Sequence, residues 1–287
     1  MKNMLFGFSI FLLTITSALV GDITSELDAF CKIDCPIKPK KKCSCRCPGK
    51  YQKHQRHHGS HPHIHLLEGT SLNWSGYAAI TSILHPTNDS VTSVSGTWTV
   101  PALSASTDKT YCAIWVGIDG FSSSTVEQIG TEHDWSGRSQ SNYAWFEMYP
   151  SGAYEIVGFP VDVHDSISAE VSYTGQNTFQ LILVNNTKNA YTIVPSSYTK
   201  STKALRSSAE WIVEAPSSNG GVLPLSHYGT IAFTNCRATI NGFTGPINSL
   251  HWANDPLTMV SQFGIIKSFP SSLAAGGESF TTTWEHE

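Results

Sequence analysis

Tyr143-Ala144-Trp145-Phe146-Glu147-Met148-Tyr149-Pro150 is the segment that indicates the fold class most clearly. Successive side chains of a β-strand point to opposite faces, so this segment has one purely apolar face and one aromatic face. The apolar face consists of Ala144, Phe146 and Met148, and the aromatic face of Tyr143, Trp145, Glu147 and Tyr149. The first face predicts a core. The second, with its central carboxylate, suits the binding of an extended polymer such as a peptide or a glycan.

A second strand-like segment, Ala209-Glu210-Trp211-Ile212-Val213-Glu214, places Glu210 and Glu214 on one face. Four residues of regular strand separate these carboxyl groups by roughly 13 Å. A glycosidase that works with paired carboxylates needs a separation of about 5 to 9.5 Å, so the two glutamates do not form such a pair. Either glutamate could act singly, and the alternative is a solvated strand face.

Outward from these segments, residues 73–287 consist of short alternating runs rich in Thr, Val, Tyr and Trp, separated by clusters of Gly, Ser, Pro and Asn. This pattern predicts an all-β sandwich or barrel without repeats. The expected strands are Val94–Val100, Ala113–Ile118, Val126–Thr131, Tyr143–Tyr149, Val161–Val163, Ala169–Tyr173, Phe179–Val184, Ala209–Glu214, Gly229–Thr234 and Phe280–Trp284.

The N-terminal part of the chain has a different character. A lysine, an apolar run and then small residues predict a secretory signal peptide over residues 1–18, with a short membrane anchor as the alternative. Residues 1–65 contain 10 Lys and Arg against 4 Asp and Glu, a net charge of +6, whereas residues 66–287 carry a net charge of −10. We therefore expect a basic leader or propeptide over residues 19–70 and a separate domain over residues 71–287.

Five of the seven cysteines and a histidine tract lie in this leader. They are Cys31, Cys35, Cys43, Cys45 and Cys47, and His54, His57, His58, His61, His63 and His65. Their spacing matches no standard zinc finger, so we expect disulfides and a solvated histidine tract rather than a metal site. In the domain, Cys112 and Cys236 either form one bridge or remain buried thiols. The opposed charges predict that the leader inhibits the domain at neutral pH and is released in acid, the alternative being a tail that only keeps the precursor soluble.

Common catalytic signatures are missing from the sequence. It contains no Gly-x-Ser-x-Gly, no His-Glu-x-x-His and no Asp-Thr-Gly motif, and the histidines of the domain are scattered singly.

Five motifs in order resemble those of the glutamic peptidases, the eqolisins. They are Asn73-Trp74-Ser75-Gly76-Tyr77, Trp115-Val116-Gly117-Ile118-Asp119-Gly120, Gln128-Ile129-Gly130, the Tyr143–Pro150 segment and the Ala209–Glu214 segment. The resemblance extends from about Leu72 to the C-terminus. It implies a sandwich of two curved antiparallel sheets, similar to the legume lectins, with a catalytic Gln and Glu on the concave face.

The resemblance implies that Gln128 and Glu214 are catalytic. It implies substrate-binding positions at Trp74, Gly76, Trp115, Asp119 and Glu147, and it does not distinguish Glu132 from Asp134 as a further acid. Glu214 could serve as general base and then as general acid, while the amide of Gln128 holds the water and stabilises the oxyanion.

The resulting expectation is a secreted, monomeric acid endopeptidase that acts on polypeptides. It needs no cofactor or metal, binds no nucleic acid and keeps no stable association with a membrane after signal cleavage. The alternatives are a lectin-like carbohydrate-binding sandwich and a glycoside hydrolase of similar fold.

Overall fold

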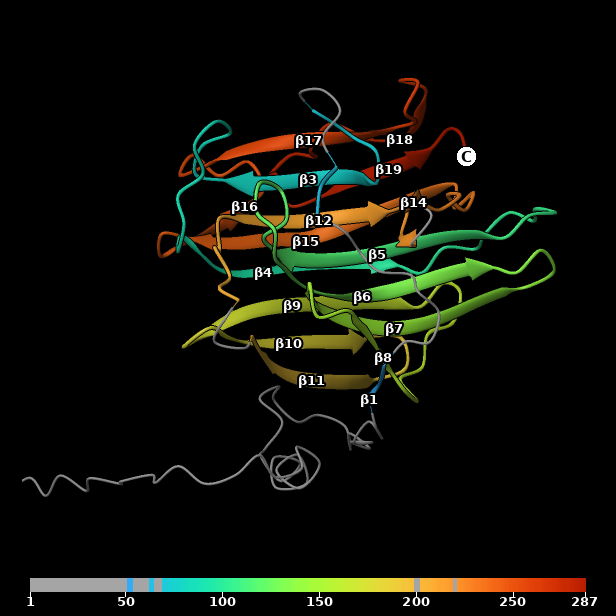
Figure 1. Ribbon diagram of the computed structural model, residues 1–287, viewed down its shortest axis with the longest axis horizontal. Coiled ribbons are helices and arrows are strands. Elements are labelled where there is room, and N and C mark those ends of the chain that lie inside the picture. Colours follow the sequence, from blue (N-terminus) through green and yellow to red (C-terminus); the bar gives the residue numbers. More distant parts are fainter. Residues whose placement is uncertain (1–50, 54–61, 65–68, 199–201, 219–220) are drawn as a thin grey trace, which may run out of the picture. The chain divides into compact units, whose positions relative to one another are not determined.

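The computed structural model describes residues 51–53, 62–64, 69–198, 202–218 and 221–287 (Figure 1). Every regular element within these ranges is a β-strand, and no helix there could span a membrane. The predicted signal peptide and the leader cysteines lie outside the described residues. The predicted all-β class is therefore confirmed.

One layer of the fold, which we call the front sheet, is antiparallel throughout and carries the segments quoted above. Its strands, in spatial order, are β17 (Ala253–Val260), β3 (Trp74–Ile80), β12 (Ser208–Glu214), β5 (Thr110–Ile118), β6 (Val126–Trp135), β7 (Gln140–Tyr149), β8 (Ala153–Ile156) and β1 (Tyr51–Lys53). The edge strand β1 comes from the predicted leader. Part of that leader is thus integrated into the front sheet.

The second layer, the back sheet, packs against the front sheet. Its central strands, in spatial order, are β11 (Ala190–Ser197), β10 (Thr178–Asn185), β9 (Ser166–Gly175), β4 (Val91–Thr99) and β15 (Thr230–Ile240). Beyond β15 lie β16 (Phe243–Pro246), β19 (Phe280–Trp284), β18 (Ile266–Pro270) and β2 (Thr70–Ser71). Strand β17 pairs with β3 of the front sheet and then with β18 of the back sheet, so it joins the two layers. A separate short ribbon pairs β13 (Ser217–Ser218) with β14 (Gly221–Val222).

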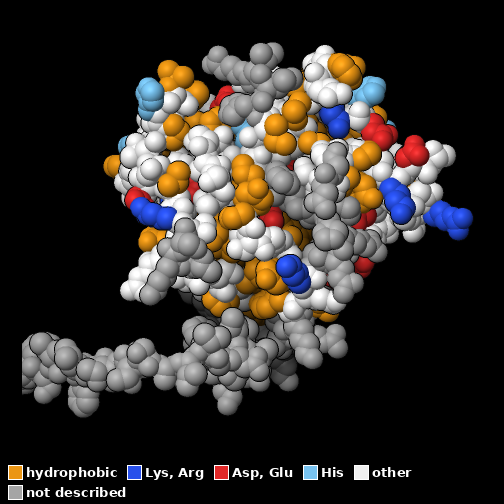
Figure 2. Space-filling view, in the orientation of Figure 1, with side chains coloured by type: hydrophobic (Ala, Val, Ile, Leu, Met, Phe, Trp, Pro, Cys, Tyr) orange, Lys and Arg blue, Asp and Glu red, His pale blue; other side chains and the backbone are white. Residues whose placement is uncertain are grey.

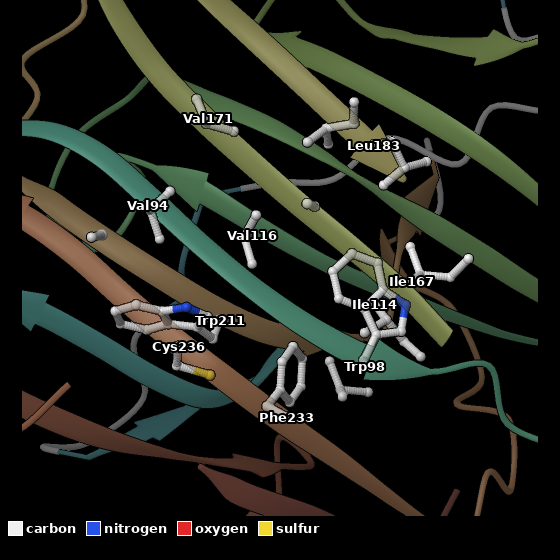
Figure 3. Packing of buried hydrophobic residues seen from close by; sticks show 14 of the residues in the cluster. Val94, Trp98, Ile114, Val116, Ile167, Val171, Leu183, Trp211, Phe233 and Cys236 are labelled. Atoms are coloured by element: carbon white, nitrogen blue, oxygen red, sulfur yellow. The ribbon is translucent and has the colours of Figure 1, made fainter. Parts of the chain in front are cut away.

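The core lies between the two sheets and is formed by side chains of both (Figure 3). Two indole groups cross from one layer to the other. Trp211 of β12 donates to the carbonyl oxygen of Ser95 at 2.7 Å, and Trp98 of β4 donates to the hydroxyl of Thr131 at 3.0 Å. Gly96 makes the first crossing possible, because a Cβ there would lie 2.8 Å from Trp211 Cδ1. The free thiols of Cys112 and Cys236 are also in this core, so the two residues are not bridged.

Nine of the ten expected strands lie within or overlap observed ones, and Val161–Val163 is wrong. This segment leads into a turn in which His164 has a positive φ of 70° and the amide of Asp162 donates to the carboxylate of Asp165 at 2.8 Å. A local side-chain acceptor of this kind competes with strand pairing. The alternation of valines was therefore misleading.

Strand β3 shows the opposite error, because it was not among the expected strands. All seven of its residues are buried, since one face packs on the core and the other on a second apolar cluster. Burial on both faces removes the apolar and polar alternation that reveals a strand in a sequence.

The surface drawn in Figure 2 carries Lys and Arg side chains that are spread over it rather than gathered into one patch. Several of them have acidic side chains nearby. This face therefore offers no concentrated positive charge.

We expect Trp211→Ala to lower the free energy of unfolding by about 3–5 kcal/mol, because it leaves a cavity and removes the hydrogen bond to Ser95. Denaturant unfolding measures the change. Leu84→Ala, at an exposed position, is the control and should change stability by no more than about 0.5 kcal/mol. A loss below about 1 kcal/mol in Trp211→Ala would contradict the assignment of this indole to the core.

Candidate active site

The two residues expected to be catalytic, Glu214 on β12 and Gln128 on β6, lie on the front sheet with β5 between them. Glu214 is opposite Ala113 of β5, and Gln128 is opposite Gly117 of the same strand. These β5 positions are four residues apart, so the two side chains point to the same face. This face points away from the core and is called the site face below. The expected shared face is observed; whether both side chains reach one water molecule stays a prediction.

Glu214 is fully buried, and N–H groups reach both of its carboxylate oxygens. Trp115 Nε1 donates to Oε2 at 2.8 Å, and Asn73 Nδ2 donates to Oε1 at 3.3 Å. Hydrogen bonds to the charged form of a carboxyl favour that form, whereas burial opposes it. Glu214 thus has specific support for carrying a negative charge inside the protein. The alternative of a solvated strand face is wrong for both Glu210 and Glu214, because both are fully buried.

Gln128 faces Glu147 of the neighbouring strand β7, and the two side chains are joined by a hydrogen bond. Gln128 Nε2 donates to Glu147 Oε2 at 3.0 Å. The carbonyl oxygen Oε1 of Gln128 is buried without a hydrogen-bond partner in the described part of the chain. One amide hydrogen and the carbonyl oxygen are therefore available to a bound molecule.

Trp115 lies between these two residues, and glycines shape the space around its indole. A Cβ on Gly130, which is opposite Trp115 in β6, would lie 2.6 Å from Trp115 Cβ. A Cβ on Gly117 would lie 2.9 Å from Trp115 Cζ3 and 3.2 Å from Gln128 Cβ. The indole thus extends from Glu214 toward Gly117, the residue opposite Gln128. Gly117 and Gly130 are thus explained by the space that Trp115 occupies.

A further acid stands close to Glu214. Glu132 of β6 faces Ala113, which in turn faces Glu214. Burial raises the pKa of Glu132 well above its ordinary value, and the charges of Asp134, Glu214 and Glu147 raise it further. The sequence did not distinguish Glu132 from Asp134 as a further acid. In the structure Glu132 is the one that lies directly across β5 from Glu214. Its raised pKa favours a protonated carboxyl in acid.

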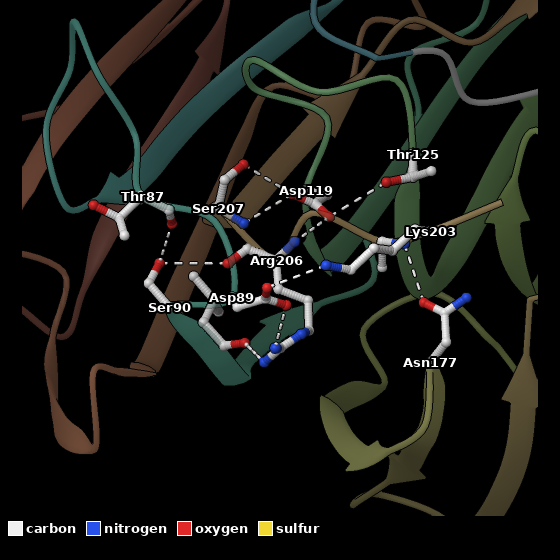
Figure 4. Close-up of polar contacts among 11 residues, drawn as sticks. Thr87, Asp89, Ser90, Asp119, Thr125, Asn177, Lys203, Arg206 and Ser207 are labelled. Atoms are coloured by element: carbon white, nitrogen blue, oxygen red, sulfur yellow. Dashed lines mark hydrogen bonds and ion pairs between the residues drawn. The ribbon is translucent and has the colours of Figure 1, made fainter.

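Asp119 holds the segment that enters β12 (Figure 4). Its carboxylate accepts hydrogen bonds from the backbone amide of Arg206 at 2.6 Å and from the amide and hydroxyl of Ser207, both at 2.9 Å. Burial raises the pKa of Asp119 against the effect of these bonds. The position follows β5 directly and has a φ of 72°. This carboxylate fixes the start of the strand that carries Glu214.

Arg206 extends the same network and was not expected from the sequence. Its guanidinium group donates to Asp89 at 2.6 Å and to the carbonyl oxygen of Val91 at 3.1 Å, and it lies 3.8 Å from the ring centre of Tyr173. A single arginine in a serine-rich stretch carries no pattern, so the sequence offers no signal for this role.

Trp74 and Gly76 belong to β3, next to β12. The rings of Trp74 and Trp115 meet edge to face with their centres 4.9 Å apart. Gly76 has a φ of 150°, and a Cβ there would lie 2.0 Å from the carbonyl oxygen of Trp211. Only glycine permits this approach of β3 to β12.

A short piece of the predicted leader lies against this part of the site. The ring of His63 stacks between Trp74 and Phe121, at centre distances of 5.7 and 5.3 Å. Its backbone amide donates to the carbonyl oxygen of Gly120 at 2.9 Å. The expectation of a solvated histidine tract is therefore wrong for His63, which is buried. Among the described residues no cluster of three or more His, Cys, Asp and Glu side chains is arranged to hold a metal ion.

Comparison with known proteins gives a consistent result. The model of the Peptidase A4 family matches residues 72–254. Aspergillopepsin-2 of Aspergillus niger is 28% identical over 292 residues, which cover 91% of this chain and 98% of that protein. Scytalidopepsin B of Scytalidium lignicola is 30% identical over 177 residues, which cover 59% of this chain and 64% of that protein.

A solved structure extends the likeness to the fold. The crystal structure of scytalido-glutamic peptidase with a transition state analog inhibitor has a TM-score of 0.62 and 23% identity, covering 74% of this chain and 98% of that one. At this identity the structure supports the fold, which is the predicted sandwich.

Buried carboxyl groups make the free energy of unfolding of the domain depend on pH in a predictable direction. Burial raises the pKa of Glu210 well above its ordinary value, and the charges of Asp119 and Glu127 raise it further. A carboxyl whose pKa is raised on folding stabilises the fold below its unfolded pKa, and this contribution is lost as the pH rises through its folded pKa. Glu210→Gln replaces the carboxyl by an amide that does not ionise, and it therefore removes this loss of stability. We therefore expect the stability of Glu210→Gln, relative to the wild type, to increase as the pH rises above about 4.3.

Denaturant unfolding of both proteins across the pH range checks this prediction. Burial lowers the pKa of His133 to about 4, so this residue makes the fold more stable as the pH rises. Both proteins contain His133, and its contribution therefore cancels from the difference between them. Glu285→Gln, at an exposed position, is the matched control. A stability difference between Glu210→Gln and wild type that stays constant with pH would contradict the prediction.

Proposed function

The chain belongs to the Peptidase A4 family, and from this premise we propose that it is a secreted acid endopeptidase in which Glu214 activates water and Gln128 stabilises the tetrahedral intermediate. The chain is a glutamic-type peptidase, and this decides against the lectin-like and glycosidase alternatives. The observation that carries the mechanistic proposal is a buried glutamate, held by two N–H donors, on the same sheet face as a buried glutamine.

The first step proposed is attack of water on the scissile carbonyl carbon. The carboxylate of Glu214 takes a proton from the water while the new C–O bond forms. Gln128 suits the supporting part, because its carbonyl oxygen can accept from the water and its second amide hydrogen can donate to the oxyanion. Glu147 holds the first amide hydrogen and so orients the group.

In the second step the C–N bond breaks, and protonated Glu214 returns its proton to the leaving nitrogen. The carboxylate is regenerated and no covalent intermediate is required. Acid conditions suit this cycle because Glu132 stays protonated there and adds no second negative charge beside Glu214.

We assign substrate binding to Trp74, Gly76, Trp115 and Glu147 on the site face, and a different role to Asp119, which was also expected to bind substrate. The carboxylate of Asp119 is occupied by the amides of the 206–207 segment, so its contribution is to position β12. We expect a monomer that acts on polypeptides without a cofactor, and export through a signal peptide over residues 1–18.

The experiment is hydrolysis of acid-unfolded haemoglobin or casein by the purified chain at acidic and neutral pH. We expect cleavage in acid, a loss of kcat of roughly 10³-fold or more in Glu214→Gln, and a loss of roughly 10²- to 10³-fold in Gln128→Ala. Glu210→Gln is the matched control on the same strand and should lose much less. Equal losses in the two glutamate variants would mean that the wrong glutamate was assigned or that both act.

The leader is proposed to inhibit the domain until acid releases it. Two described pieces of it contact the domain: β1 pairs with β8, and His63 stacks on Trp74 beside the site. Acid would neutralise carboxylates of the domain, which weakens their attraction for the basic leader. It would also charge the histidines of the leader, which then repel one another.

A pH jump from neutral to acid tests this inhibition through the delay before a slowly cleaved peptide is hydrolysed. We expect His63→Ala to shorten the delay severalfold, because it removes the aromatic stacking that holds the leader. His85→Ala, at an exposed position, should behave as the wild type. An unchanged delay in His63→Ala would refute the role of this contact.

A further inference from the structure

The carboxylate of Glu214 accepts a hydrogen bond from Asn73, a residue to which the proposed mechanism gives no role. Asn73 immediately precedes β3 and is fully buried. Its side-chain amide donates to Glu214 Oε1 at 3.3 Å, and its backbone carbonyl oxygen accepts from the amide of Ala215 at 2.9 Å. Asn73 therefore contacts the end of β12 through both its side chain and its backbone.

The hydrogen bonds around Asn73 determine which way its amide group points. The hydroxyl oxygen of Ser71 accepts from the backbone amides of Asn73 at 3.3 Å and Trp74 at 3.0 Å. The hydroxyl hydrogen of Ser71 is therefore free to donate to Asn73 Oδ1, at an oxygen–oxygen distance of 3.0 Å. The backbone amide of Ile64 donates to the same oxygen at 3.0 Å. With two donors on Oδ1, the NH2 group must face Glu214.

From this network we propose that Asn73 is a positioning residue for the reaction, which holds the carboxylate of Glu214 in its ionised form and in line with the attacking water. The inference rests on the proposed function, in which Glu214 is the general base. Asn73 acts through the Glu214 carboxylate that it holds, and it neither takes nor gives up a proton in the proposed reaction.

The surroundings of Glu214 explain why such a residue is needed. Glu132 from β6 is an acid close enough for its charge to interact with that of Glu214, and burial also opposes a charge on Glu214. Trp115 supplies a donor to one carboxylate oxygen and Asn73 supplies a donor to the other. With both oxygens engaged, rotation of the carboxylate is restricted as well.

Asn73→Ala tests the proposal in the full chain, assayed in acid on unfolded haemoglobin. We expect kcat to fall roughly 10- to 100-fold with little change in KM, the size of a lost hydrogen bond to a charged group. The acid limb of the pH–activity profile should move to higher pH by about one unit, because loss of the donor favours the protonated carboxyl. A purely structural role would lower stability without moving this limb.

Asn185→Ala is the matched control, because Asn185 is also fully buried and its amide donates to a carboxylate, that of Asp165, at 2.7 Å. It lies on β10 of the back sheet and should lower the free energy of unfolding while leaving the pH–activity profile unchanged. Ser71→Ala keeps the amide but removes one donor that orients it. We expect a smaller shift of the acid limb in the same direction, and this variant decides the matter if Asn73→Ala does not fold.

The possible outcomes separate this inference from the proposed function. A wild-type chain without acid proteolysis, or a fully active Glu214→Gln, would remove the proposed function itself. If the wild type is active and Glu214→Gln is inactive, an unchanged acid limb in Asn73→Ala overturns the positioning role. If Asn73→Ala does not fold, an unchanged limb in Ser71→Ala overturns it.

Discussion

Glu214 is a fully buried glutamate in the middle of a β-sheet, and the mechanism we propose requires it to carry a negative charge there. Glu214 sits on β12 between β3 and β5, with a core on one side of the sheet and an apolar cluster on the other. N–H groups of Asn73 and Trp115 donate to its two oxygens. Donors of this kind stabilise a carboxylate and still allow it to take up a proton, as the proposed mechanism requires.

The residues that hold the Glu214 side chain in place come from distant parts of the chain. Trp115 can place its indole beside Glu214 because Gly117 and Gly130 leave room for the ring. Gly76 lets β3 approach β12 closely. The Asp119 carboxylate, bound to the backbone of residues 206–207, fixes where β12 begins. Gly76, Gly117, Gly130 and Asp119 are therefore explained by the packing of β12 and of the indole that reaches Glu214.

Strand periodicity was sufficient to predict the faces of β7 and β12 from the sequence. Ala144, Phe146 and Met148 do lie in the core, and the aromatic residues between them lie on the opposite face. The method failed for β3, where burial on both sides leaves no alternation, and for Val161–Val163, where an aspartate side chain stabilises a turn.

The candidate site could be predicted only where its residues belong to recognisable motifs. Asn73 was within a quoted motif, but its role depends on contacts with Ser71, Ile64 and Glu214 that arise only when the chain has folded. The position of His63 follows from an aromatic stack between residues far apart in the sequence. Arg206 acts through its backbone amide and through a guanidinium group whose partners come from other loops and strands. Composition and spacing contain no trace of such contacts.

The central claim is that Glu214 and Gln128 act together on one tetrahedral carbon. A crystal structure of the chain with a peptide mimic, in which a hydroxyl-bearing tetrahedral carbon replaces the scissile carbonyl, tests this claim most directly. The account predicts that the hydroxyl lies within hydrogen-bonding distance of both the Glu214 carboxylate and the Gln128 amide. A hydroxyl bound by Glu210 or Glu147 instead, with Gln128 and Glu214 unable to reach the same atom, would contradict it.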